Sequence, residues 1–133
     1  TLANAIQIGD PVSYKKAINV LKTFHGIVEQ ATEDELANAS AQADRTGLFS
    51  CPHTGVALAV LRKLLKGKMI RPEEKVVVIS TAHGLKFPEF KIDYHENKLD
   101  EVTSRFANLP VEVPPQYDAV RTAIYRKLEK ISG

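Results

Sequence analysis

The chain has 133 residues, 44% of them hydrophobic and 26% charged, which is the composition of an ordinary globular domain. Its 18 basic residues are scattered among 16 acidic ones, so the net charge of +2 is not gathered into the basic stripe that nucleic-acid binders show. A single cysteine, Cys51, excludes an internal disulfide, and no apolar run approaches the ~20 residues that span a bilayer. We therefore expect a reducing compartment, with neither nucleic acid nor membrane as a partner.

The first ten residues carry no initiator methionine and no signal-peptide pattern, which suggests a piece of a longer protein. Asp10-Pro11 predicts a helix start, because Asp is a good N-cap and Pro is tolerated at the first helical position. Gly26 supplies a stop for this helix. The β-prone residues 26–31 then predict a short strand.

A capping box predicts the second helix. Thr32 and Glu35 have the spacing at which each side chain satisfies a backbone donor of the other, and the helix is expected to end near Gly47. Residues 48–51 predict a second short strand, which Pro52 breaks.

The third predicted helix runs from His53 to Lys66 and ends at Gly67. Apolar side chains cover much of its surface, so we expect it to be largely buried. They are Val56, Leu58, Val60, Leu61, Leu64 and Leu65. Residues 75–80 form an apolar run without alternation, which is typical of a strand covered on both faces.

The alternation of strands and helices predicts an α/β fold, with a parallel sheet and flanking helices. After Gly84, scattered prolines indicate mostly loop, and a closing helix is expected from about Gln116 to Lys130. We therefore assign residues 1–95 to the sheet-containing part and residues 96–133 to a C-terminal extension of loop and helix.

Two polar segments follow predicted strands, at the edge where parallel α/β sheets bind ligands. They are residues 51–55 and 80–84, and both are small and contain glycine. Small residues let the backbone approach a ligand, and hydroxyls can meet a ring nitrogen or a phosphate oxygen. An equally weighted alternative is that these Ser and Thr side chains only cap the following helices.

Other constellations fit the sequence less well. Cys51 and His53 lack a second pair at ligand spacing, so a metal site is not expected. Ser80, His83 and Asp93 lack the Gly-x-Ser-x-Gly pattern of a hydrolytic triad. The seven glycines never cluster, so this chain has no phosphate-cradling loop.

Residues 80–87, Ser-Thr-Ala-His-Gly-Leu-Lys-Phe, closely resemble threonine synthases of the plant type. Residues 5–11, 26–29 and 51–58 match further blocks of that family in its order and spacing. The resemblance implies the C-terminal portion of a fold type II pyridoxal-phosphate enzyme, and a parent carbon–oxygen lyase that converts O-phosphohomoserine and water to threonine and phosphate.

The resemblance also implies roles for particular residues. Thr81 occupies the position whose hydroxyl hydrogen-bonds the pyridine nitrogen of pyridoxal 5′-phosphate, and Ala5 matches the small residue packed on the ring face. His83 and Gly84 would shape the adjoining wall. Lys86 would lend positive charge toward the substrate phosphate, although a solvated lysine explains it at least as well.

Two features of the family have no match here, namely the Schiff-base lysine and the phosphate loop; residues 90–93 are only superficially similar to the lysine block. We therefore expect no catalytic residue in this chain, an inactive isolated chain, and the N-terminal segment of the same enzyme as its partner. The family implies a homodimer, located in the plastid stroma of a plant and otherwise in the cytoplasm. A non-catalytic structural or interaction fragment, and part of a related lyase such as threonine deaminase, are the alternatives.

Overall fold

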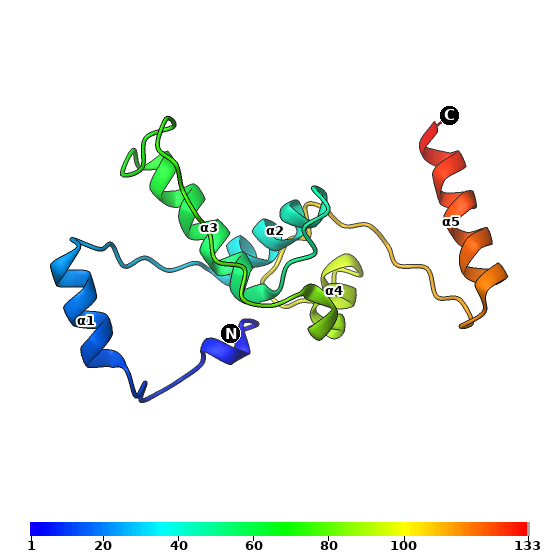
Figure 1. Ribbon diagram of the computed structural model, residues 1–133. Helices are drawn as coiled ribbons and strands as arrows, with labels where there is room; N and C mark the ends of the chain where they lie inside the picture. Colours follow the sequence, from blue (N-terminus) through cyan, green and yellow to red (C-terminus); the bar gives the residue numbers. More distant parts are fainter. Residues whose placement is uncertain (133) are drawn as a thin grey trace.

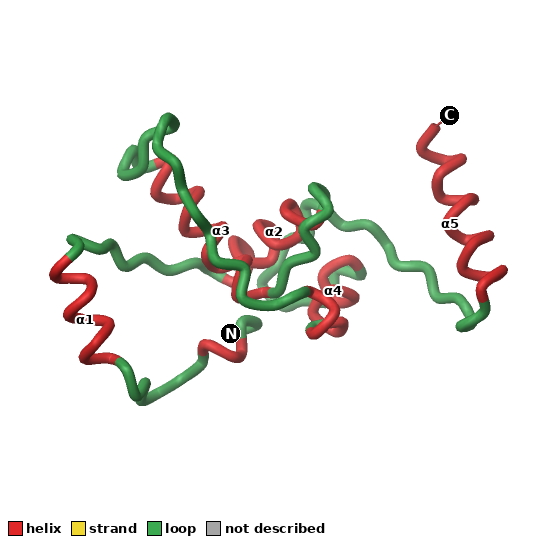
Figure 2. The backbone as a smooth tube through the Cα atoms, viewed as in Figure 1, coloured by secondary structure: helices red, strands yellow, loops and turns green. Residues whose placement is uncertain are grey.

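The computed structural model describes residues 1–132, and in this part of the chain it shows helices and loops but no sheet (Figures 1 and 2). Gly133, the last residue of the predicted extension, lies outside the described residues. The helices are α1 (Tyr14–Thr23), α2 (Glu33–Asp44), α3 (Pro52–Lys66), α4 (Pro88–His95) and α5 (Tyr117–Ser132), with short 3-10 turns η1 (Asn4–Ile6) and η2 (Gly84–Lys86).

The predicted parallel α/β sheet is wrong. Residues 26–31, 48–51 and 75–80 are not strands, and the pairing found within residues 1–132 is one isolated antiparallel bridge between Ser50 and His83. A β-prone composition indicates that a segment by itself favours the extended conformation. A sheet also needs a neighbouring backbone that accepts and donates hydrogen bonds. Residues 75–80 have no such neighbour, and Val77 in this segment is 89% exposed.

The helix predictions rest on local signals and are mostly confirmed. The capping box opens α2, with the Thr32 hydroxyl accepting from the Glu35 backbone N–H and the Glu35 carboxylate accepting from that of Thr32. Gly67 follows the end of α3 as expected. The first helix, in contrast, begins at Tyr14 rather than at Pro11.

The expected burial of α3 is only partly correct. The buried residues of this helix are small or lie in its first half, whereas the large apolar side chains are half-buried and Leu65 is exposed. Gly55 explains the close approach to α2, because a Cβ at this position would lie 2.4 Å from the carbonyl oxygen of Leu36. Helix α3 therefore meets α2 through its backbone.

The core lies where α2 and α4 meet the N-terminal segment. Its buried apolar residues are Ala3, Leu36, Ala37, Ala41 and Tyr94. Helix α4, which supplies Tyr94, falls in a stretch predicted to be mostly loop. Helices α1 and α5 stand apart from this group, as Figure 1 shows. None of the helices within residues 1–132 combines the length and the apolar character needed to cross a membrane.

Candidate functional site

The N-terminal end of α3 is where the two polar segments meet. Cys51 is the N-cap of this helix, and its Sγ accepts the backbone N–H of Thr54 at 3.4 Å. The hydroxyl of Thr54 lies 3.2 Å from Cys51 Sγ and 3.2 Å from the hydroxyl of Ser80. Residues 51–55 and 80–84 are therefore joined by side-chain contacts, although the strands expected to bring them together are not formed.

The backbone also holds these two segments together. Ser50 and His83 form the antiparallel bridge, and the N–H of Gly84 donates to the carbonyl oxygen of Phe49 at 2.8 Å. Thr81 lies just before this bridge, with its Oγ1 at 3.9 Å from Cys51 Sγ and its side chain exposed.

Ala5, the other residue expected near the cofactor, reaches the same end of α3. Its backbone N–H donates to Nε2 of His53, in the first turn of α3, at 2.9 Å. Ala5 lies in the turn η1, which the buried Ala3 precedes as N-cap. Ala5 and Thr81 are thus each in contact with the first residues of the same helix, Ala5 through His53 and Thr81 through Cys51.

Lys86, the predicted substrate-binding residue, ends the turn η2 and is exposed. Its backbone N–H donates to His83, while its ammonium makes no hydrogen bond or ion pair within residues 1–132. His83 precedes η2 and fixes this turn, because its Nδ1 accepts the N–H of Leu85 at 3.2 Å. Lys86 therefore projects from a fixed turn with a free charge.

Cys51 has unusual electrostatics for a buried thiol. Burial acts to raise its pKa, but hydrogen bonds from the side chain and backbone of Thr54, and from His53 and Thr81, outweigh burial and lower the pKa to about 6. A position at a helix N-terminus favours the thiolate in the same way. The thiol is fully buried, so it is a hydrogen-bonded part of the N-terminal end of α3 rather than an exposed nucleophile.

Sequence reasoning missed a buried polar cluster behind the site. Nζ of Lys91, in α4, lies 2.6 Å from Oδ2 of Asp44 and 2.8 Å from Oγ of Ser40, both in α2. Burial lowers the pKa of Lys91, while the hydrogen bond and the charge of Asp44 act to raise it. The signal in the sequence was a lysine in the stripe Phe87, Lys91 and Tyr94, whose spacing of four and then three residues is that of one helix face.

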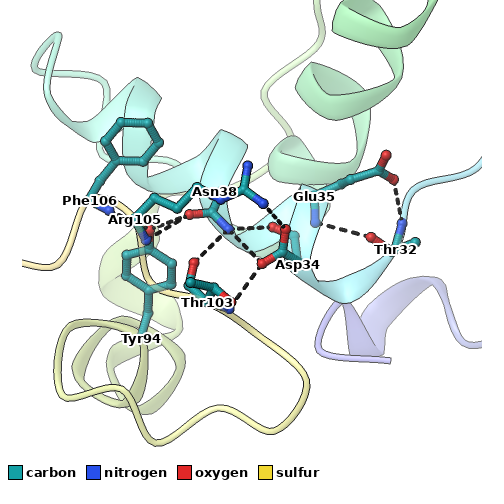
Figure 3. A network of polar contacts seen from close by, with 8 residues as sticks. All are labelled: Thr32, Asp34, Glu35, Asn38, Tyr94, Thr103, Arg105 and Phe106. Carbon is teal, nitrogen blue, oxygen red and sulfur yellow. Dashed lines mark hydrogen bonds and ion pairs between the residues drawn. The ribbon is translucent and has the colours of Figure 1, made fainter.

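A second network ties the loop after α4 to α2 (Figure 3). Asn38 donates to the carbonyl oxygen of Thr103 at 3.0 Å, and Asp34 accepts the Thr103 N–H at 2.9 Å. Arg105 forms an ion pair with Asp34, and the hydroxyl of Tyr94 donates to Asn38 at 2.8 Å. This network holds the core that supports the site and lies apart from Thr81 in sequence and contacts.

Residues 1–132 contain no group of three or more His, Cys, Asp and Glu side chains placed to hold a metal ion. Cys51 and His53 instead make the contacts described above.

Comparison with known proteins identifies a consistent set of relatives. The chain is 52% identical over 97% of its length to the chloroplastic threonine synthase 2 of Arabidopsis thaliana. It is 36% identical over 74% of its length to a threonine synthase of Methanocaldococcus jannaschii, and 34% identical over 96% to one of Methanosarcina acetivorans. The match covers 25%, 25% and 29% of these relatives, so the chain spans about a quarter of their length. No family model matches the chain.

Proposed function

The chain belongs to the threonine synthase family and matches a C-terminal portion of its members, and from this premise we propose that it forms one part of a pyridoxal-phosphate-dependent threonine synthase. The complete enzyme acts as a carbon–oxygen lyase that converts O-phosphohomoserine and water to threonine and phosphate. The observation that supports this proposal is that Thr81 and Ala5 lie at the same end of α3. Thr81 contacts Cys51 there, and Ala5 contacts His53.

The hydroxyl of Thr81 suits the pyridine end of the cofactor. It is exposed, and its approach to Cys51 Sγ within residues 1–132 is long, at 3.9 Å, so its single proton can turn from the sulfur to a ring nitrogen. The cofactor, when bound, supplies an electron sink for carbanions. A neutral hydroxyl at its nitrogen does not stabilise a full positive charge there, so Thr81 keeps that sink milder than an aspartate would.

Ala5 and Lys86 complete the part of the site that this chain would contribute. Ala5 is small and its backbone is fixed by His53, so its methyl group can pack against a flat ring without crowding it. Lys86 carries a free ammonium at the end of η2, where it can attract the phosphate of the substrate. Ala5 and Lys86 would orient ring and substrate, while proton transfer falls to other residues.

The remaining parts of the site belong, in this proposal, to the segment that precedes these residues in the complete synthase. Lys91 is committed to Asp44 at 2.6 Å and is 6% exposed, so it is not the lysine that would hold the cofactor covalently. The isolated chain is then inactive, and its partners are O-phosphohomoserine, the N-terminal segment and a second copy of the enzyme. One relative carries the word chloroplastic in its name, and we propose the same compartment for this chain.

The proposal is tested by changing the hydroxyl at Thr81 in the complete synthase. Thr81→Asp should shift the absorbance spectrum of the bound cofactor and change the division of products, because a carboxylate stabilises a protonated ring nitrogen. Thr81→Ser is the matched control, since it keeps the hydroxyl. A Thr81→Asp enzyme with the spectrum and turnover of the unchanged enzyme would remove Thr81 from the site.

The assignment of the covalent lysine to the other segment of the enzyme has a separate test. The 133-residue chain is mixed with pyridoxal phosphate, reduced with borohydride and mapped by mass spectrometry. We expect no stoichiometric attachment at a specific lysine. Attachment at one defined lysine would contradict the assignment of the covalent lysine to the other segment.

A further inference from the structure

We propose that the ion pair between Lys91 and Asp44 is a positioning element, which fixes residues 49–51 and through them the Thr81–Gly84 turn of the candidate site. The part of this inference that concerns the cofactor rests on the function proposed above. Lys91 lies in α4 and Asp44 at the end of α2, and neither contacts Thr81, so both act through other residues.

The pair, together with Ser40, holds Ser50 at both of its backbone groups. Oδ1 of Asp44 accepts the N–H of Ser50 at 2.9 Å, while Oδ2 binds Lys91. Ser40, which accepts from Lys91 at 2.8 Å, donates its hydroxyl to the carbonyl oxygen of Ser50 at 3.3 Å. Ser50 is fully buried, so these contacts are protected from competition with water. Its backbone position is thus set by groups that Lys91 connects.

Ser50 is in turn linked directly to the candidate site, through the next residue and through the bridge that it forms. The next residue is Cys51, the N-cap of α3 whose Sγ approaches the hydroxyl of Thr81 at 3.9 Å. Ser50 itself forms the bridge with His83, two residues beyond Thr81. A shift of Ser50 would therefore move both the sulfur beside Thr81 and the backbone that follows it.

Lys91 also packs against the far side of the same turn. Its ammonium lies 4.8 Å from the ring centre of Phe49, at a distance suited to a cation–π contact. A Cβ at Gly84 would lie 2.9 Å from Cε of Lys91 and 2.8 Å from the ring of Phe49. The lysine stem and Phe49 thus form the surface on which Gly84 rests, and a larger residue at this position would require the stem or the ring to shift.

The two charges must act together, because each is stabilised by the other in a buried position. Removing one partner leaves an uncompensated buried charge, which is more disruptive than removing both. The two single variants should therefore loosen Ser50 more than the double variant does. A lysine that served only to fill space would not show this pattern.

The test uses the complete synthase with Lys91→Met, Asp44→Asn, the double variant and Lys91→Arg. Lys98→Met is the matched control, since Lys98 is an exposed lysine that pairs with Glu96 next to α4. Two readings are taken: the rate at which N-ethylmaleimide modifies Cys51 without cofactor, followed peptide by peptide, and the Kd and absorbance spectrum of bound pyridoxal phosphate.

We expect Lys91→Met and Asp44→Asn to speed modification of the buried Cys51 by about tenfold or more, because local opening exposes it. We also expect them to weaken cofactor binding by about tenfold and to shift its spectrum, as misplaced contacts do. Lys91→Arg should restore most of both readings, and Lys98→Met should change neither. The double variant, which leaves no unpaired charge, should show a smaller increase than either single variant, and that increase is the decisive reading where a single variant does not fold.

Each result decides a different point. An unchanged rate at Cys51 in Lys91→Met and Asp44→Asn, or in the double variant where these do not fold, would overturn the positioning role outright. Faster modification with unchanged cofactor affinity and spectrum would show that the pair holds residues 49–51 but does not act on the cofactor site. Failure of the function proposed above appears separately, as an unmodified complete protein that binds no pyridoxal phosphate.

Discussion

The hydroxyl of Tyr94 offers a sharp test of the network that holds the loop after α4 (Figure 3). It donates to Oδ1 of Asn38 at 2.8 Å and accepts the backbone N–H of Phe106 at 3.1 Å, and the side chain is 2% exposed. Tyr94→Phe removes this one oxygen and preserves the ring that packs in the core. The variant therefore isolates the polar contribution of the residue from its apolar one.

The size of the effect follows from which partners are left unpaired. Asn38 Oδ1 still accepts the N–H of Arg105 at 3.1 Å, so it keeps one hydrogen bond. The N–H of Phe106 loses the acceptor that it has in the structure. One half-buried donor without a partner costs about 1–2 kcal/mol, which corresponds to a factor of roughly 5–30 in the opening equilibrium of the loop.

Hydrogen exchange of the complete synthase measures this opening locally. Peptides covering residues 103–108 should exchange roughly 5–30 times faster in Tyr94→Phe, while peptides from α5 stay unchanged. Tyr117→Phe is the control, because Tyr117 is exposed and its hydroxyl makes no hydrogen bond within residues 1–132. Equal exchange of residues 103–108 in Tyr94→Phe and the unchanged enzyme would refute the role of this hydroxyl.

Three further predictions concern α2 and α3. Gly55→Ala would place a methyl group 2.4 Å from the carbonyl oxygen of Leu36, and forcing the helices apart should lower the free energy of unfolding by about 1–3 kcal/mol, measured by urea unfolding. The hydrogen bond from Lys63 lowers the pKa of Glu35 below 4.5, so its contribution is present above pH 4.5 and is lost as the pH falls through the lowered pKa. Glu35→Gln should therefore flatten the acid side of the stability curve. The thiolate absorbance of Cys51, taken as the difference between the unchanged enzyme and Cys51→Ser, should titrate with a midpoint near pH 6, against the ordinary 9.0, and a midpoint near 9.0 would contradict the hydrogen bonding described for its sulfur.

The parts of the fold that the sequence predicted are those with short-range causes. The capping box of Thr32 and Glu35 closes within four residues, and the backbone N–H of Gly67 closes the end of α3 on the carbonyl oxygen of Lys63, four residues earlier. These interactions form wherever the segment lies, so tertiary context does not change them. Residues 75–80 show the opposite case, because a strand there depends on a neighbouring backbone that the pattern of valines does not specify.

The sequence predicted that two polar segments belong to one site, but the sheet from which this was inferred is not formed. Residues 51–55 and 80–84 were expected to meet at the edge of a sheet, and they do lie together, but hydroxyl and sulfur contacts and a single bridge join them. The alternative that the Ser and Thr side chains cap the following helices is not what the structure shows, because the caps are Cys51 for α3 and His83 for η2. The contact of Ala5 with His53 spans 48 positions and had no local signal.

Lys91 shows most clearly why the remaining contacts could not be predicted from the sequence. A lysine in a polar stretch is normally expected to be solvated, because burying its charge costs free energy. The stripe of Phe87, Lys91 and Tyr94 contradicted the default, but the stripe alone does not name the acid that must accompany a buried lysine. Asp44 lies 47 residues away, at the end of another helix, and carries no mark in the sequence that separates it from the other acids of α2. A buried charge is thus evident from one segment, whereas its partner, and therefore the route from Lys91 to Ser50 and Thr81, is decided by how α2 and α4 pack.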